Sequence, residues 1–511
     1  MIAALIRWSI VNRFLVVVAA LGLAVAGGIA IRSTPVDALP DLSDVQVVIH
    51  TEWPGEPPNI IEDQVTYPLV TTFLAAPRVK AVRAQTMFGD SYIFVVFQDG
   101  TDLYWARSRV LEYLQQVQGE LPSGVHPVIG PDATGAGWIY EYLLVDRTHK
   151  YSLADLRALQ DWYLRYQLES VPGVAEVATI GGFVRQYQVN LDPDKLRAYG
   201  IPLQTVIDRV RASTNEVGGR LLELGGAEYM IRGLGYLRSL DDLREVPVAV
   251  HDGTPVLVGD LGTVGFGPDI RRGVAEWDGQ GETVAGIVVM RFGENALNVI
   301  NGVKAKLAAI APSLPPGVEI KAGYDRSGLI QASVATLQRD LIVEMIIVSL
   351  VIIVFLLHFR SALVPIVALP IALAAAFIPM YWLRISANIM SLGGLALAIG
   401  VMVDAAIVMV ENGVRHLADR PAEAALLAPR ERRRTLIAAA RQVGTPIFFS
   451  LIIIIVSFLP VFLLQAQEGR MFRPLAWTKT LSIGFSSLLA ITLVPALRRQ
   501  AGPGRDHRGH H

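Results

Sequence analysis

The chain has 511 residues, of which 52% are hydrophobic and 18% charged, and its mean hydropathy is +0.42. This composition is too apolar for an ordinary soluble protein and indicates a membrane protein with sizeable polar parts. The formal net charge of −1 gives no sign of nucleic-acid binding, and the lack of cysteine excludes disulfides and thiolate metal sites.

The first hydrophobic run, Phe14–Ile31, follows Arg7 and Arg13. A cleavable signal peptide is one interpretation, but the run exceeds the usual h-region of about 7–15 residues, and no small-x-small site precedes Arg32 cleanly. We therefore predict that residues 1–31 form an uncleaved anchor whose N-terminus is cytoplasmic.

A large, more polar region follows, and its first part, residues 32–133, alternates strand and helix patterns. The order is β-α-β-β-α-β, which is that of the ferredoxin-like split βαβ unit. The predicted elements are Val45–Trp53, Asn59–Ala75, Val79–Met87, Ser91–Phe97, Asp102–Leu121 and His126–Ile129.

A second copy of this unit is predicted in residues 134–180 and 274–328. Its predicted elements are Ile139–Val145, Leu153–Ser170, Val174–Ile180, Val284–Arg291, Ala296–Ala311 and Val318–Tyr324. Residues 181–273 interrupt the copy and contain a predicted strand, Gln186–Asn190, and a predicted helix, Leu203–Ser213. Such an insertion suits docking to another subunit or simple surface decoration, and periodicity leaves both open.

Five further hydrophobic runs fall within residues 329–497, so the fold class is a six-span α-helical membrane bundle plus an α+β external region. The runs are Leu341–Leu357, Ala362–Leu383, Ile389–Val410, Val443–Leu464 and Thr478–Leu497. The segment between the fourth and fifth spans is rich in arginine, which places it, like the N-terminus, in the cytoplasm. The external region then lies in the periplasm of a bacterium with two membranes.

Asp404 lies in the middle of the span Ile389–Val410, where a carboxylate costs about 2.5–3.5 kcal/mol on insertion scales. Such a residue carries protons or ions, or it is held by a neighbouring helix for structure. Glu411, seven residues on, shares its helical face, although capping or solvation also explains an acid at the membrane edge. The small residues of this span predict close helix packing at the centre of a bundle.

Met402 and Met409 share a second face, about 140–160° around the helix from Asp404. Methionines at helical spacing are most often packing residues. Thioethers nevertheless prefer soft ions such as Cu(I) and, by the same softness, Ag(I). The pattern alone does not decide between the two.

With these residues in view, the chain resembles a resistance-nodulation-division (RND) permease of the heavy-metal-efflux branch, most closely the copper/silver (Cus-type) inner-membrane pumps. The resemblance covers Met1–Leu497 and rests on one span, a loop of about 300 residues and five more spans. It rests also on the stretches TPVDALPDLSDVQV, SVPGVAEVATIGGFVRQYQV and GVMVDAAIVMVEN.

The resemblance implies a proton/metal cation antiporter, not an enzyme, and no nucleophile-elbow, P-loop or HExxH pattern opposes this. It implies two porter subdomains with a docking insertion, and a homotrimer that works with a periplasmic adaptor and an outer-membrane channel. Asp404 matches the family's proton-relay acid, with Glu411 as a second candidate. Met390, Met402 and Met409 match a proposed methionine relay for the transported ion, and no cofactor is expected.

The match covers only the N-terminal half of such a pump. The divalent-ion relatives carry a second Asp where this chain has Ala398, which favours Cu(I)/Ag(I). The lysine expected to pair with Asp404 belongs to the missing half, and residues 498–511, with His507, His510 and His511, resemble nothing in the family. Two alternatives remain: a half-transporter completed by a separately encoded second half, and a truncated fragment that does not transport.

Overall fold

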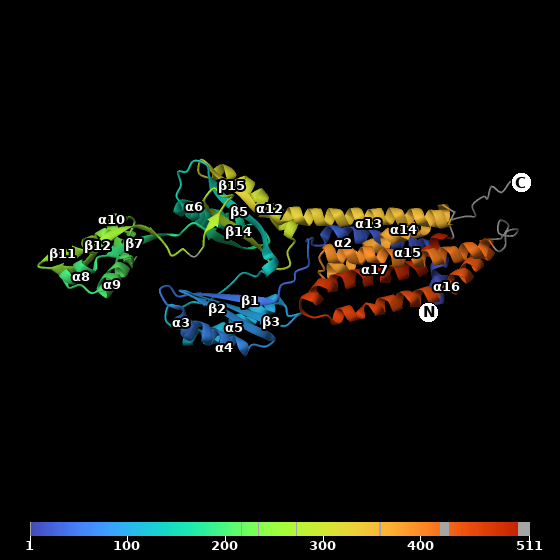
Figure 1. The fold of residues 1–511 in the computed structure, drawn as a ribbon, viewed down its shortest axis with the longest axis horizontal. Coiled ribbons are helices and arrows are strands. Elements are labelled where there is room, and N and C mark those ends of the chain that lie inside the picture. The colour runs from blue at the N-terminus through green and yellow to red at the C-terminus, as the bar shows by residue number, and fades with distance from the viewer. Residues whose placement is uncertain are drawn as a thin grey trace.

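The long apolar runs form helices that pack side by side at one end of an elongated molecule (Figure 1). This computed structural model describes residues 2–215, 217–233, 235–271, 273–356, 359–418 and 429–498. The long helices are α2 (Arg13–Ser33), α13 (Arg326–Leu356), α14 (Phe359–Trp382), α15 (Ile389–Ala418), α16 (Pro429–Ser457) and α17 (Ala466–Arg498).

Within the described residues, five helical segments are long and apolar enough to cross a membrane. They are Arg13–Ser33, Ser361–Trp382, Ile389–Gly413, Arg434–Leu463 and Ala466–Leu497. The expected span Leu341–Leu357 falls within α13, which is not among the five, and Leu357 lies outside the described residues. The count of six spans therefore stays a prediction.

Close contacts between the long helices depend on small residues. A Cβ placed on Gly27 of α2 would lie 2.4 Å from the backbone oxygen of Ala374 in α14, and one on Gly394 of α15 would lie 2.2 Å from Oγ1 of Thr478 in α17. Only glycine lets these backbones approach so closely. A short helix that the sequence did not predict, α1 (Ile2–Val11), also packs into the bundle.

The first external unit is a four-stranded antiparallel sheet with helices on one face. Its strands are β1 (Gln46–Glu52), β2 (Val79–Met87), β3 (Asp90–Phe97) and β4 (Val128–Ile129), in the order β2-β3-β1-β4. Its helices are α3 (Pro58–Ile61), α4 (Tyr67–Leu74) and α5 (Leu103–Val117). Alternate strand residues such as Val47 and Ile49 are buried with the helices, while His50 and Glu52 lie on the other face.

The second external unit has the corresponding strand order, β6-β14-β5-β15. Its strands are β5 (Trp138–Asp146), β6 (Val174–Gly181), β14 (Glu282–Met290) and β15 (Val318–Asp325), with β13 (Ala275–Glu276) beside the start of β14. Its helices are α6 (Leu153–Leu159), α7 (Arg165–Glu169) and α12 (Ala296–Ile310). Both units thus run β-α-β-β-α-β along the chain.

The two units also share a local irregularity. Each first helix contains one π-helical turn, Glu62–Thr66 in the first unit and Gln160–Leu164 in the second. Each π turn directs a polar side chain inward: Thr66 bonds Ser91 at 2.7 Å, and Gln160 accepts the hydroxyl of Tyr142 at 2.7 Å.

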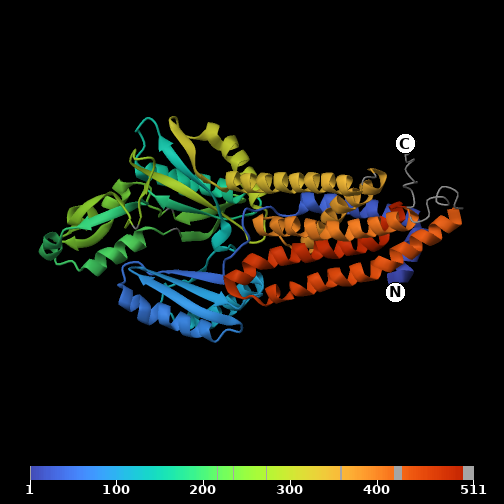
Figure 2. The same ribbon diagram turned by 45° about the vertical axis from the view of Figure 1, so that its right-hand side comes forward.

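The insertion in the second unit lies at the end of the molecule farthest from the long helices (Figure 2). Its strands β7 (Arg185–Leu191) and β12 (Gly262–Pro268) pair with each other, as do β10 (Pro247–His251) and β11 (Thr254–Leu257). With α8 (Pro193–Tyr199), α9 (Leu203–Ser213), α10 (Leu240–Arg244) and α11 (Val258–Leu261) they enclose a separate small core. The hairpin β8 (Val217–Leu224) and β9 (Ala227–Gly233) pairs only with itself among the described strands.

Candidate functional site

The helix α15 begins at a reciprocal cap, which fixes its entry point between its neighbours. The Asn388 carboxamide oxygen accepts the backbone N–H of Ser391 at 3.0 Å, and the Ser391 hydroxyl accepts the backbone N–H of Asn388 at 2.8 Å. Both side chains are buried. The cap satisfies groups that a buried helix end would otherwise leave without partners.

One side of α15 has no neighbour among the described residues. We call it the open stripe; it consists of Leu397, Gly400, Asp404, Val408 and Glu411, all exposed. The spacings of three and four residues make it continuous along the helix. Leu397 is 56% exposed, and a Cβ on Gly400 would meet nothing within 4 Å. The predicted close packing is therefore seen on the other faces of α15, while this face is exposed among the described residues.

Asp404 lies at the middle of the open stripe. Its carboxylate forms no hydrogen bond or ion pair with any other described residue. A carboxylate on an apolar helix face is costly without a cation or a proton. Glu411 lies two turns away on the same side.

Met402 and Met409 lie on the packed side of α15, 1% and 3% exposed. Each borders a separate cavity of about 10 Å³, which is about the space of one water molecule. Met390 is half-buried and lies about 120° around the helix from Met402. The three thioethers are thus not brought together in this arrangement.

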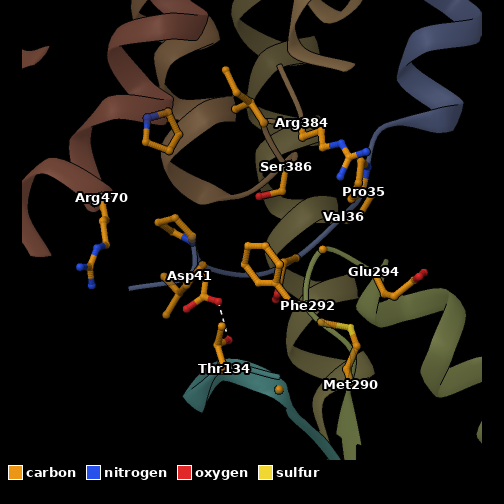
Figure 3. A pocket seen from close by; sticks show the side chains of 18 of the residues that line it. Pro35, Val36, Asp41, Thr134, Met290, Phe292, Glu294, Arg384, Ser386 and Arg470 are labelled. Carbon is orange, nitrogen blue, oxygen red and sulfur yellow. Dashed lines mark hydrogen bonds between the residues drawn. The ribbon is translucent and has the colours of Figure 1, made fainter. Parts of the chain in front are cut away.

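A cavity of about 740 Å³ lies where the helix bundle meets the external units (Figure 3). Figure 3 shows that Asp41, Arg384 and the stretch from Met290 to Glu294 lie around it, although they are far apart in the sequence. Aromatic residues also line it, namely Tyr381, Trp382 and Trp477. Tyr and Trp are enriched at membrane–water interfaces. These residues are therefore the feature of the sequence that could have indicated where the helix bundle meets the external units.

Two arginines link the external units to the long helices by hydrogen bonds and ion pairs near this cavity. Arg470 of α17 donates to the backbone oxygen of Leu42 and to Asp44, both at 2.8 Å, and to Asp99. This hydrogen bond from Arg470 holds the pKa of Asp99 below its usual value.

Arg326, the first residue of α13, pairs with Asp37 at 3.0 Å and donates to the backbone oxygen of Ala136 at 2.6 Å. Burial raises the pKa of Asp37, which the Arg326 charge opposes. Sequence reasoning missed both arginines because their partners are distant in the chain.

The sequence and the fold are both similar to those of known proteins. Residues 5–500 match the family described as "AcrB/AcrD/AcrF family". The chain is 53% identical over 500 residues to the cation efflux system protein CusA of Escherichia coli K12, covering 97% of this chain and 48% of that protein. It is 51% identical to the putative cation efflux system protein SilA of Salmonella typhimurium, with the same coverage of 97% and 48%.

A solved structure described as a heavy metal efflux pump has the same fold. It superposes with a TM-score of 0.83 at 32% sequence identity, over 96% of this chain and 48% of that one. The chain thus spans about half the length of the relatives that it matches.

Proposed function

Because this chain belongs to the AcrB/AcrD/AcrF family, we propose that it is the N-terminal half of an inner-membrane heavy-metal efflux permease driven by protons. The membership implies a transporter, not an enzyme. The similar proteins named as cation efflux proteins and the similar heavy metal efflux pump support this class of cargo. The apolar helices fit a membrane location, and the external units would face the periplasm.

The observation that carries the proton coupling is the exposed Asp404 in the middle of a helix long enough to span a membrane. Neutralising that carboxylate removes a cost of about 2.5–3.5 kcal/mol. One charge moved across 100 mV is worth about 2.3 kcal/mol, so a single protonation is comparable to the available driving force. Protonation from outside and release inward would tilt α15 against its neighbours.

The second half of the permease would cover the open stripe. Its chemistry must complement Asp404, and a helix bearing a lysine, as the family resemblance implies, provides the missing cation. This half is either the remainder of a longer chain or a separately encoded protein. A trimer of the complete unit would work with a periplasmic adaptor and an outer-membrane channel.

The proposed cargo is Cu(I) or Ag(I), with Met390, Met402 and Met409 as thioether ligands along the path. Ala398 stands where the divalent-ion relatives carry an acid, and it is fully buried among apolar side chains. That position therefore offers no charge for a divalent ion. A soft ion bound by thioethers needs none.

Asp404→Asn tests the proton coupling in a complete pump that carries this half. We expect loss of copper and silver resistance at unchanged expression, because the amide cannot take up and release a proton. Growth on graded copper or silver measures the effect.

The matched control is Leu21→Asn, which places the same amide at an exposed apolar position of α2, outside the open stripe, and should leave resistance intact. Resistance retained by Asp404→Asn would contradict the proton relay. If the chain confers no resistance together with a second half, the alternative that it is a fragment without transport activity is favoured.

A further inference from the structure

The bare face of the first sheet carries polar side chains in two neighbouring rows. Glu52 of β1 lies opposite Asp90 of β3, and two residues away His50 lies opposite Tyr92. Residues two apart on a strand share a face, so all four side chains project from the side without helices. The hydrogen-bonded ladder fixes their relative positions.

His50 is held in one orientation by two contacts. Its Nε2 lies 3.0 Å from Oδ1 of Asp90, and its ring stacks on Tyr92 with a centroid separation of 4.3 Å and an interplanar angle of 15°. The side chains of His50 and Asp90 are 30% and 11% exposed, while Glu52 is exposed. Two of the three polar groups are therefore partly sheltered, and the third reaches them from solvent.

The ligand atoms of His50, Glu52 and Asp90 all lie within 4.8 Å of one another. A tetrahedral, zinc-like ion with bonds of about 2.0–2.2 Å needs neighbouring ligand atoms about 3.3–3.6 Å apart. The 3.0 Å gap between His50 and Asp90 is a few tenths of an ångström shorter, which rotation of the two side chains can adjust. Glu52 has a flexible side chain in solvent and can close the remaining distance.

We propose that His50, Glu52 and Asp90 bind a divalent transition-metal ion of the Zn²⁺ or Ni²⁺ class. One imidazole and two carboxylates are borderline-to-hard ligands that suit such ions, unlike the thioethers proposed for the cargo. The remaining coordination positions face solvent and would hold water. The site lies in the first external unit, far along the chain from α15. Metal binding at this site can therefore be measured without measuring transport.

The chain has a second histidine–aspartate pair, which lacks the third potential ligand of the His50 cluster. His251 lies 3.6 Å from Asp252, with side chains 55% and 94% exposed, but these are sequence neighbours. Among the described residues, only the His50 cluster brings three potential ligands within 4.8 Å. His251 is therefore a matched control for a histidine beside a carboxylate.

The test uses the full chain purified in detergent, titrated calorimetrically with Zn²⁺, Ni²⁺ and Mg²⁺. Every arm carries asparagine in place of His507, His510 and His511, so that those imidazoles cannot bind the probe. We expect one Zn²⁺ per chain, much weaker Mg²⁺ binding, and an X-ray absorption spectrum with a single imidazole among oxygen ligands.

His50→Asn and Glu52→Gln should each weaken Zn²⁺ binding by at least about tenfold, since even changes outside the ligand shell cost about 10- to 100-fold. His251→Asn should bind as the parent does. Glu52→Gln alters only an exposed side chain, so it remains informative if His50→Asn fails to fold.

Two results would overturn the proposal. The first is unchanged Zn²⁺ affinity in the variants of the cluster, which would leave His50 and Asp90 as a simple hydrogen-bonded pair. The second is Mg²⁺ binding as tight as Zn²⁺ binding, which would indicate an ordinary acidic surface.

Discussion

At the scale of single residues, Met402 and Met409 of α15 are packed too tightly to hold an ion as they stand. Met402 lines one small cavity with Leu489 and Ala490 of α17, and Met409 lines another with Leu436 of α16. A metal ion with its ligands needs more room than these cavities provide. If Met402 binds the proposed cargo ion, α15 and α17 must separate there, which would couple the ion's entry to the position of the helix that carries Asp404.

Replacing Met402 and Met409 together by leucine separates packing from ion binding. Leucine nearly conserves the volume, so each substitution should cost less than about 1.5 kcal/mol of stability. If the thioethers carry Cu(I) or Ag(I), export into everted vesicles by a complete pump should fall several-fold. Met380→Leu is the control, since Met380 is also fully buried but belongs to α14. Equal transport by the double variant would assign both methionines to packing alone.

Helical geometry was sufficient to predict which side of α15 each of these residues occupies. The step of 100° per residue sets Asp404 about 160° from Met402, and the structure has one exposed and the other buried. Their roles in transport stay predictions. Arg470 could not be predicted, because its partners Asp99 and Asp44 are 371 and 426 residues away in the chain.

At the scale of elements, periodicity located strands and helices but not their interruptions. The predicted ranges Val79–Met87 and Leu203–Ser213 are those of β2 and α9. The π turns were missed because one extra residue per turn hardly changes a hydrophobic pattern. The helix α1, which ends just before Asn12, was missed because residues 2–11 are too few to give a membrane-span signal.

The hydrogen bonds of Arg470 connect two elements, α17 and the loop after β3, and they also involve the backbone. The Asp99 carboxylate accepts from Arg470 and from the backbone N–H of Ala466, the latter at 3.1 Å. Ala466 has a left-handed φ of 52°, which is costly for alanine and is maintained by its surroundings. These hydrogen bonds join the start of α17 to the first external unit.

The stabilisation from the Arg470–Asp99 interaction should fall at acidic pH. Since the folded-state pKa of Asp99 is lowered, its stabilisation is complete above the ordinary value of about 4 and is lost as pH falls through the lowered pKa. Amide hydrogen exchange around Ala466, corrected for the intrinsic pH effect, should show less protection at pH near 3 than near 7.

Asp99→Asn should show low protection at both values, because the amide carries no charge for Arg470. Glu112→Gln removes an exposed acid, paired with Arg109, elsewhere in the same unit and should leave the exchange unchanged. Equal protection in Asp99→Asn and the parent would show that the Arg470–Asp99 interaction does not stabilise the backbone around Ala466.

At the scale of the whole molecule, the hairpin β8–β9 exposes more apolar surface than a two-stranded element can support alone. Leu224 is 65% and Met230 86% exposed, and Leu222, Tyr229 and Ile231 are also exposed. Isolated hairpins are marginally stable in water, and exposed apolar patches mark interaction sites. We expect the hairpin to be buried against a neighbouring copy in the proposed trimer.

Met230→Asp should therefore shift the assembled protein toward smaller species, measured by native mass spectrometry in detergent. A charge in an apolar contact must lose its hydration without gaining a partner. Val250→Asp is the control, since Val250 is 71% exposed in the other hairpin of the same insertion. An oligomer unaffected by Met230→Asp would exclude the hairpin from the contact between subunits.

The helix α13 gives the two ends of the molecule a common rigid part. It follows β15 without a loop and runs for 31 residues, about 46 Å at 1.5 Å per residue. Ile330 near its start is fully buried in the core of the second unit, and Ile352 near its end is fully buried in the bundle. A rigid rotation of α13 by about 5° about its bundle end would therefore displace β15 by about 4 Å. That amplitude is comparable to the spacing of neighbouring strands, so a small rotation among the long helices would shift the second external unit by nearly one strand width.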